Sequence, residues 1–205
     1  MRAFIAIIII SIFCCFQTNA QDTVRFLNGR CISGKVVSNS NETIIHLTKS
    51  HKTHSKTKKY FKEDVFDIRY GTGSKEVLYL ADSNRGNYFS EDEMDRYISG
   101  MQNARINYKA PWVTVGGFAA GAAGLYWGFW GLAAPAAYAV TFSVIPVKTK
   151  GKPYLKDHIG DEYYIEGFNA MAHRKKVKNA LLGGIGGALL VGITTAILTF
   201  KFAND

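Results

Sequence analysis

The chain has 205 residues, a formal net charge of +9 and 47% hydrophobic residues, a length that suits one ordinary domain or a small domain with a membrane part. Such a positive charge suggests nucleic acid as the partner of a cytosolic protein, but the leader described next indicates export, so no nucleic acid is expected. Anionic lipid head groups or acidic envelope polymers are better partners for the basic stretches. With three cysteines, two of them in the leader, a disulfide framework is excluded.

Residues 1–20 have the pattern of a secretory signal peptide. Arg2 supplies the positive start, Ala3 to Phe16 form an apolar run, and Thr18-Asn19-Ala20 provides small residues for cleavage. The apolar run is shorter than the roughly 20 residues that a membrane span needs, although an uncleaved N-terminal anchor remains the alternative. The mature chain is therefore expected to begin near residue 21.

Residues 21–89 are predicted to form a small antiparallel β-sheet or barrel. Asn28-Gly29 is a hairpin signal between two alternating runs, and further strand-like runs cover 43–48, 65–70 and 77–80. The basic loop from Lys49 to Lys62 is interpreted as a charged, solubilising hairpin rather than a lipid-binding patch. The run from Phe26 to Val36, with its turn glycine and bent second strand, resembles the first strands of SH3-like and Sm-like barrels. That resemblance implies a fold and no RNA-binding role.

Three histidines of this domain, His46, His51 and His54, are the only candidates for metal ligands. Clustered imidazoles bind copper or zinc, but this spacing matches no closed zinc site and no carboxylate lies nearby in the sequence. A solvated loop is the favoured interpretation, so no metal or other cofactor is expected.

Residues 90–147 are predicted to contain an amphipathic helix followed by a glycine-rich membrane hairpin. Ser90 and Glu93 form a capping box that marks the helix start, and apolar residues follow at three- and four-residue steps. The uncharged run from residue 111 to 147 is longer than one span and contains an aromatic, glycine-rich turn. It is interpreted as two short spans, 112–127 and 132–147, with one kinked span and a re-entrant part as the alternative.

Residues 148–205 are predicted to contain a polar connection, a helix that begins at Asp161-Glu162, and a third span over 179–202. A basic segment just before that span lies where lipid head groups are expected. Its candidate lipid-binding residues are Arg174, Lys175, Lys176 and Lys178.

The segments 97–124 and 164–191 look like an internal repeat with a constant offset of 67 positions, which pairs Tyr97 with Tyr164 and Gly100 with Gly167. Small residues on one helix face allow close approach of helices in lipid. The glycines expected to mediate this packing are Gly116, Gly117, Gly121, Gly124, Gly183, Gly184 and Gly187. Packing of one repeat against the other is favoured over homo-oligomerisation, which stays open.

The sidedness of the polar connection is contested within the sequence. Three spans place residues 148–179 on the same side as the β domain, outside the cytoplasm. The eight Lys and Arg of that connection favour a cytoplasmic position, as a two-span arrangement would give. The direction of the repeats and the aromatic turn favour three spans.

The strand pair Asn28-Gly29-Arg30 to Gly34-Lys35 and the two Tyr-Ile-x-Gly helices that end in Gly-Gly resemble uncharacterised envelope proteins of Bacteroidota. The resemblance implies an α+β membrane protein and supplies no activity. The prediction is a non-enzymatic accessory or scaffold subunit, in contact with lipid and other envelope proteins, in the inner membrane with its β domain on the periplasmic side. The alternative is a small oligomeric channel, although its spans carry no ionisable group. Catalysis by Asp161 and Glu162 is disfavoured, because no partner nucleophile is recognisable.

Overall fold

The computed structural model describes residues 21–38, 44–51, 54–125, 133–149 and 151–203. The chain divides into two compact units, Met1–Asn87 and Tyr88–Asp205, and each is considered by itself. The predicted signal peptide and the aromatic turn at 126–132 lie outside the described residues. An N-terminal six-stranded sheet followed by helices confirms the predicted α+β composition.

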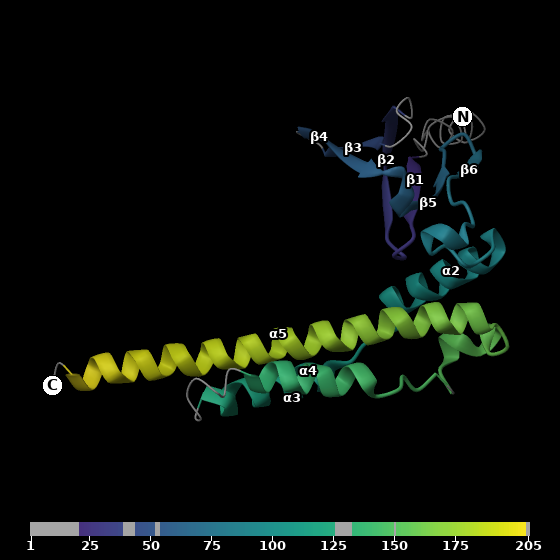
Figure 1. The fold of residues 1–205 in the computed structure, drawn as a ribbon. Coiled ribbons are helices and arrows are strands. Elements are labelled where there is room, and N and C mark those ends of the chain that lie inside the picture. The colour runs from purple at the N-terminus through teal and green to yellow at the C-terminus, as the bar shows by residue number, and fades with distance from the viewer. Residues whose placement is uncertain (1–20, 39–43, 52–53, 126–132, 150, 204–205) are drawn as a thin grey trace, which may run out of the picture. The chain divides into compact units, whose positions relative to one another are not determined.

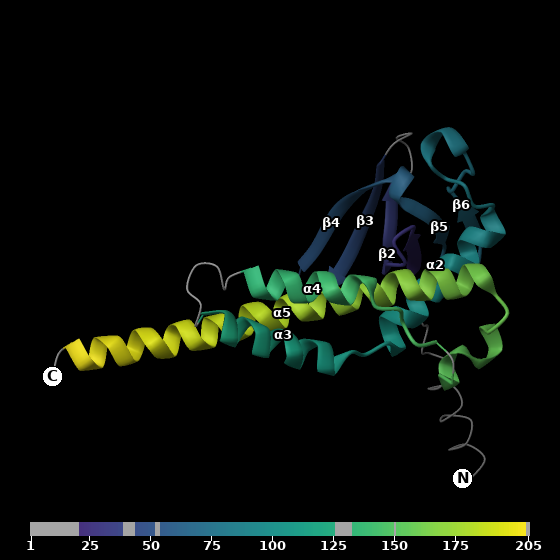
Figure 2. The same ribbon diagram turned by 60° about the horizontal axis from the view of Figure 1, so that its bottom comes forward.

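The first unit is a six-stranded antiparallel sheet with the strand order β4-β3-β2-β1-β5-β6 (Figure 2). Its strands are β1 (Asp22–Phe26), β2 (Cys31–Ser38), β3 (Ile44–His51), β4 (His54–Phe61), β5 (Val65–Arg69) and β6 (Lys75–Val77). The predicted hairpin at Asn28-Gly29 joins β1 to β2, and Gly29 has a φ of 72°, a conformation that glycine adopts without steric cost. Gly34 lies so close to β3 that an added Cβ would be 2.8 Å from the carbonyl oxygen of Thr48.

Alternating side chains of these strands form the core of the sheet. The buried apolar residues include Val24, Phe26, Ile45, Leu47, Val65 and Ile68. Beside them lies a buried ion pair, in which Arg25 Nε donates to Asp67 Oδ1 at 2.7 Å while Asp67 is fully buried. A buried carboxylate is tolerated when a charged partner satisfies it in this bidentate way.

The basic stretch that was interpreted as a charged hairpin lies in the strand pair β3 and β4. These strands pair continuously from Ile44 opposite Phe61 to His51 opposite His54. β4 is the edge strand of the sheet. Lysines suit such a strand because they stay solvated and discourage pairing with another chain.

The second unit is helical. Its elements are α2 (Glu91–Asn107), α3 (Pro111–Gly124), α4 (Ala134–Val144), the 3-10 helix η4 (Pro153–His158) and α5 (Glu162–Ala203). The predicted capping box is present at α2, where the Glu93 carboxylate accepts from the Ser90 backbone N–H at 2.8 Å. Tyr163 of α5 also donates to Glu93, and this hydrogen bond is the main reason that the pKa of Glu93 is lowered.

The helices α2, α3 and α4 lie along the single long helix α5, which extends beyond α3 and α4 at its C-terminal end (Figures 1 and 2). Near the N-terminal part of α5, the core is formed by Met101, Ala104, Leu155, Tyr164, Phe168, Met171 and Ala172. Asn103 ties this region together by donating to the backbone oxygen of Tyr154 at 2.9 Å and to the hydroxyl of Tyr164 at 2.6 Å.

The prediction of about three transmembrane helices is wrong in its count. Within the described residues, α5 is the single helix that is long and apolar enough to cross a membrane. With 14 and 11 residues, α3 and α4 extend about 21 Å and about 17 Å, less than the roughly 30 Å hydrocarbon core of a bilayer. The uncharged run from residue 111 to 147 was long enough for two spans, but it forms two short helices, with Pro111 at the first position of α3 and Pro135 at the second position of α4.

Candidate functional site

The candidate site is the part of the second unit that carries most of its glycine, formed by α3, α4 and α5 from Ala180 onward; it is called the apolar bundle below. Glycines bring α3 and α5 into backbone contact there. A Cβ added to Gly117 or Gly121 would collide with the backbone of Ala180 or Gly184 on α5. In the opposite direction, a Cβ on Gly183 or Gly187 would collide with the backbone of Thr114 or Phe118 on α3. Contact this close requires glycine on both helices.

The remaining predicted packing glycines lie against α4 or inside α3. A Cβ on Gly116 would meet the Tyr138 side chain, and one on Gly184 would meet Pro135. Gly124 is buried near the end of α3. Gly186, by contrast, has no atom nearer than 3.9 Å to its added Cβ, so this glycine is not at a helix contact.

The same type of contact occurs between α2 and the start of α5. A Cβ on Gly100 would collide with the backbone oxygen of Tyr164, and one on Gly167 would collide with that of Tyr97. The offset of 67 positions relates Tyr97 to Tyr164 and Gly100 to Gly167, and each contact joins a residue of one pair to a residue of the other. Along α3 the contacts advance from Gly117 with Ala180 to Gly121 with Gly184, and along α2 they advance from Glu93 with Tyr163 to Tyr108 with Lys175, so both helices lie parallel to α5. Common ancestry of the two segments remains a prediction.

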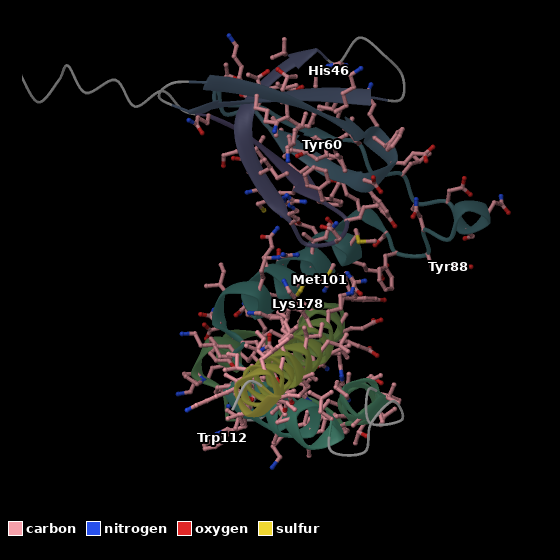
Figure 3. The ribbon with its side chains drawn as sticks, turned by 90° about the vertical axis from the view of Figure 1, so that its left-hand side faces the viewer. His46, Tyr60, Tyr88, Met101, Trp112 and Lys178 are labelled. Carbon is pink, nitrogen blue, oxygen red and sulfur yellow. The ribbon has the colours of Figure 1, made fainter. Side chains whose placement is uncertain are left out.

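The large apolar side chains of the bundle point outward. While the glycines face the neighbouring helix, exposed side chains on α3 and α5 include Val115, Phe118, Leu182, Ile185, Leu189, Leu190, Ile193 and Ile197. In water such an arrangement leaves a large apolar surface exposed, whereas in lipid it matches the solvent. Trp112, at the start of α3, is 83% exposed and points away from the helices (Figure 3).

Two adjacent lysines bind backbone carbonyls at the polar end of the apolar bundle. Lys175 Nζ donates to the backbone oxygens of Arg105 and Tyr108, both at 2.7 Å, and to that of Ala104 at 3.1 Å. Lys176 Nζ donates to the oxygens of Ile145 at 3.0 Å and Pro146 at 3.3 Å. The carbonyls of Ala104 and Arg105 lie in the last turn of α2, and the others lie just after α2 and α4. A cation at such a position complements the helix dipole.

Burial affects the ionisation of the groups at this end. It lowers the pKa of both Lys175 and Lys176, and the charges of Arg105 and Lys109 lower the pKa of Lys175 further. Burial, followed by the charge of Lys176, also lowers the pKa of His173, whose Nδ1 is buried without a hydrogen-bond partner in the described structure. A neutral His173 is therefore favoured beside the two capping lysines.

The four predicted lipid-binding cations thus fall into two pairs. Lys175 and Lys176 direct their ammonium groups at backbone carbonyls, whereas Arg174 and Lys178 are exposed on the same face of α5. These two exposed cations line a shallow groove of about 550 Å³ on α5. The groove is lined by His173, Arg174, Val177, Lys178, Leu181 and Leu182. Sequence reasoning missed the capping role, because it depends on where α2 and α4 end in space.

The predicted metal-ligand candidates of the β unit are spread along one hairpin. His46 pairs with Lys59, while the backbone of His51 pairs with that of His54 at the end of the strands. Five residues separate His46 from His51, which is about 16 Å along a strand. The strand register therefore does not bring the three histidines together (His46 is labelled in Figure 3). Among the described residues, no group of three or more His, Cys, Asp or Glu is placed to hold a metal ion.

Comparisons with protein-family models, curated proteins and solved structures find no match to this chain.

Proposed function

We propose that this protein is a non-enzymatic membrane protein of the bacterial envelope and an accessory or scaffold subunit of a membrane assembly. In this proposal α5 crosses the bilayer, α3 and α4 form a short re-entrant hairpin beside it, and the β unit serves as the interaction domain. The observation that carries the proposal is the inverted packing of the apolar bundle, with glycines at the helix contacts and large apolar side chains outside.

The length of the apolar part of α5 supports a transmembrane position. From Lys178 to Lys201 the helix rises about 35 Å, slightly more than the hydrocarbon thickness of a bilayer. The basic end at Arg174 to Lys178 and the exposed Trp112 then lie near one membrane surface, where Trp and basic residues are enriched. The capping lysines keep the carbonyls of α2 and α4 satisfied at that depth, which lipid requires.

The re-entrant hairpin determines the sidedness of the chain. Because α3 enters and α4 returns, the β unit and residues 148–179 share one side of the membrane, and the C-terminus lies on the other. With a cleaved leader, the shared side is periplasmic and the membrane is the inner one, since α-helical spans are typical there.

Sidedness is testable with a cysteine at Thr149. In a chain with Cys31 replaced by serine, Thr149→Cys is expected to react with a membrane-impermeant maleimide in intact spheroplasts, because residue 149 is periplasmic in this arrangement. Ala203→Cys serves as the matched control and is expected to react only after lysis. Protection of residue 149 in intact spheroplasts would show that the connection is cytoplasmic and that this topology is wrong.

The role in an assembly is testable by purification in a mild detergent. A C-terminally tagged chain from its own host is expected to carry a second protein in stoichiometric amount, detected by mass spectrometry of the intact complex. A homo-oligomer free of other chains would contradict the accessory role and favour the channel alternative, which conductance across planar bilayers then tests.

A further inference from the structure

We propose that the groove on α5 binds a single anionic phospholipid, with the phosphate between Arg174 and Lys178 and an acyl chain along Val177, Leu181 and Leu182. The inference rests on the proposed membrane function and adds the class of ligand and its site. It is distinct from general attraction of a basic protein to a membrane, because it assigns binding to two of the four cations in one short segment.

The order of side chains along the groove matches the order of groups in a phospholipid. Arg174 and Lys178 are four residues apart, so they lie on one helix face, one turn apart. Leu181 and Leu182 follow in the next turn, in the direction of the apolar bundle. From residue 174 to residue 182 the helix rises about 12 Å, which takes the groove from the polar end of the bundle into its apolar part.

The two groove cations are available to a ligand, whereas their neighbours are not. Lys175 and Lys176 each donate to backbone carbonyls of other elements. Within the described part of the chain, neither Arg174 nor Lys178 forms an ion pair with a carboxylate. His173 adds no further positive charge to the groove, since burial lowers its pKa and favours the neutral ring.

Charge also selects among the possible occupants. The phosphate of an anionic head group offsets one of the two positive charges and adds none, whereas a zwitterionic choline head group brings a further positive charge beside them. A second copy of this chain docked through the same groove would place two pairs of like charges against each other, which is unfavourable. An anionic phospholipid therefore complements the groove better than either alternative.

The test is a lipid titration of the full chain followed by native mass spectrometry. The detergent-solubilised wild type is expected to retain phosphatidylglycerol in preference to phosphatidylcholine. Each cation near an anionic surface contributes about a fivefold effect, so Arg174→Gln with Lys178→Gln should weaken phosphatidylglycerol retention by about 25-fold. The matched control, Lys152→Gln with Lys156→Gln, removes the same charge from exposed positions elsewhere in the unit and should retain the lipid.

Three results would overturn the inference. Equal loss in the groove and control variants would indicate charge attraction without a site. Equal retention of both lipids by the wild type would show no selectivity. Dimer masses that disappear in the groove variant would indicate a second copy in the groove. Flotation of the protein with pure phosphatidylcholine vesicles separates the two proposals: failure to float would overturn both, whereas flotation without lipid selectivity would overturn the lipid site alone.

Discussion

Gly121→Leu is expected to separate α3 from α5 and to destabilise the helical unit by about 3 kcal/mol or more, at the upper end of overpacking effects. An added Cβ at residue 121 would collide with the backbone of Gly184, and a backbone atom cannot rotate away as a side chain does. The measurement is unfolding in mild detergent by titration with sodium dodecyl sulfate, followed by circular dichroism.

Gly186→Leu provides the matched control within the same glycine-rich stretch. Its added Cβ has no atom nearer than 3.9 Å, and that atom belongs to the Phe118 side chain, so the new side chain starts without a backbone collision. Because glycine is a poor helix former, the substitution is expected to be neutral or to stabilise by up to about 1 kcal/mol. Wild-type stability of the Gly121 variant, or equal losses in both variants, would show that the contact between α3 and α5 is absent.

Leu189→Lys is expected to remove the protein from the membrane fraction. Leu189 is 60% exposed and lies near the middle of the apolar part of α5. In water, lysine at an exposed position changes stability by less than about 0.5 kcal/mol, whereas at the centre of a membrane helix it costs about 2.5–3.5 kcal/mol. That cost corresponds to roughly a 100-fold change in the insertion equilibrium. The fraction that resists alkaline carbonate extraction measures it.

Ile106→Lys is the control for the membrane prediction. Ile106 is 73% exposed on α2, outside the apolar bundle, so the same change there is expected to leave membrane retention unaffected. If Leu189→Lys also stays fully in the membrane fraction, or if both variants remain folded in the soluble fraction, the exposed apolar face of α5 does not contact lipid.

Local signals predicted the elements whose ends are set by local chemistry. The Asn28-Gly29 turn and the Ser90 capping box act within a few residues, and the structure places a hairpin and a helix start at these positions. β4 was missed, because its lysines give a polar pattern without a buried face. Only its place at the edge of the sheet makes such a strand stable.

The count of spans failed for a different reason. Hydropathy measures how long an uncharged run is, and the run from residue 111 to 147 has enough residues for two spans. Hydropathy does not show where helices end. The helices α3 and α4 are shorter than a membrane span, and they pack along α5 rather than cross a bilayer separately.

The basic segment shows what a sequence leaves unresolved at a site. Successive residues of a helix point about 100° apart, so four nearby cations face several directions. Which of them cap neighbours depends on the positions at which α2 and α4 end. The division into Lys175 and Lys176 on one side, and Arg174 and Lys178 on the other, is therefore a property of tertiary structure.

The parallel contact between the two halves of the helical unit has a consequence for self-association. The face of α3 that contacts α5 and the face of α5 that contacts α3 are both lined by glycine. The connection between them keeps the second face at an effective concentration on the order of millimolar, so another molecule competes for it only when its own concentration approaches that value. Because α3 and α5 belong to one chain, their glycine-lined faces bind each other within the molecule. In two separate peptides the same faces would form a dimer interface.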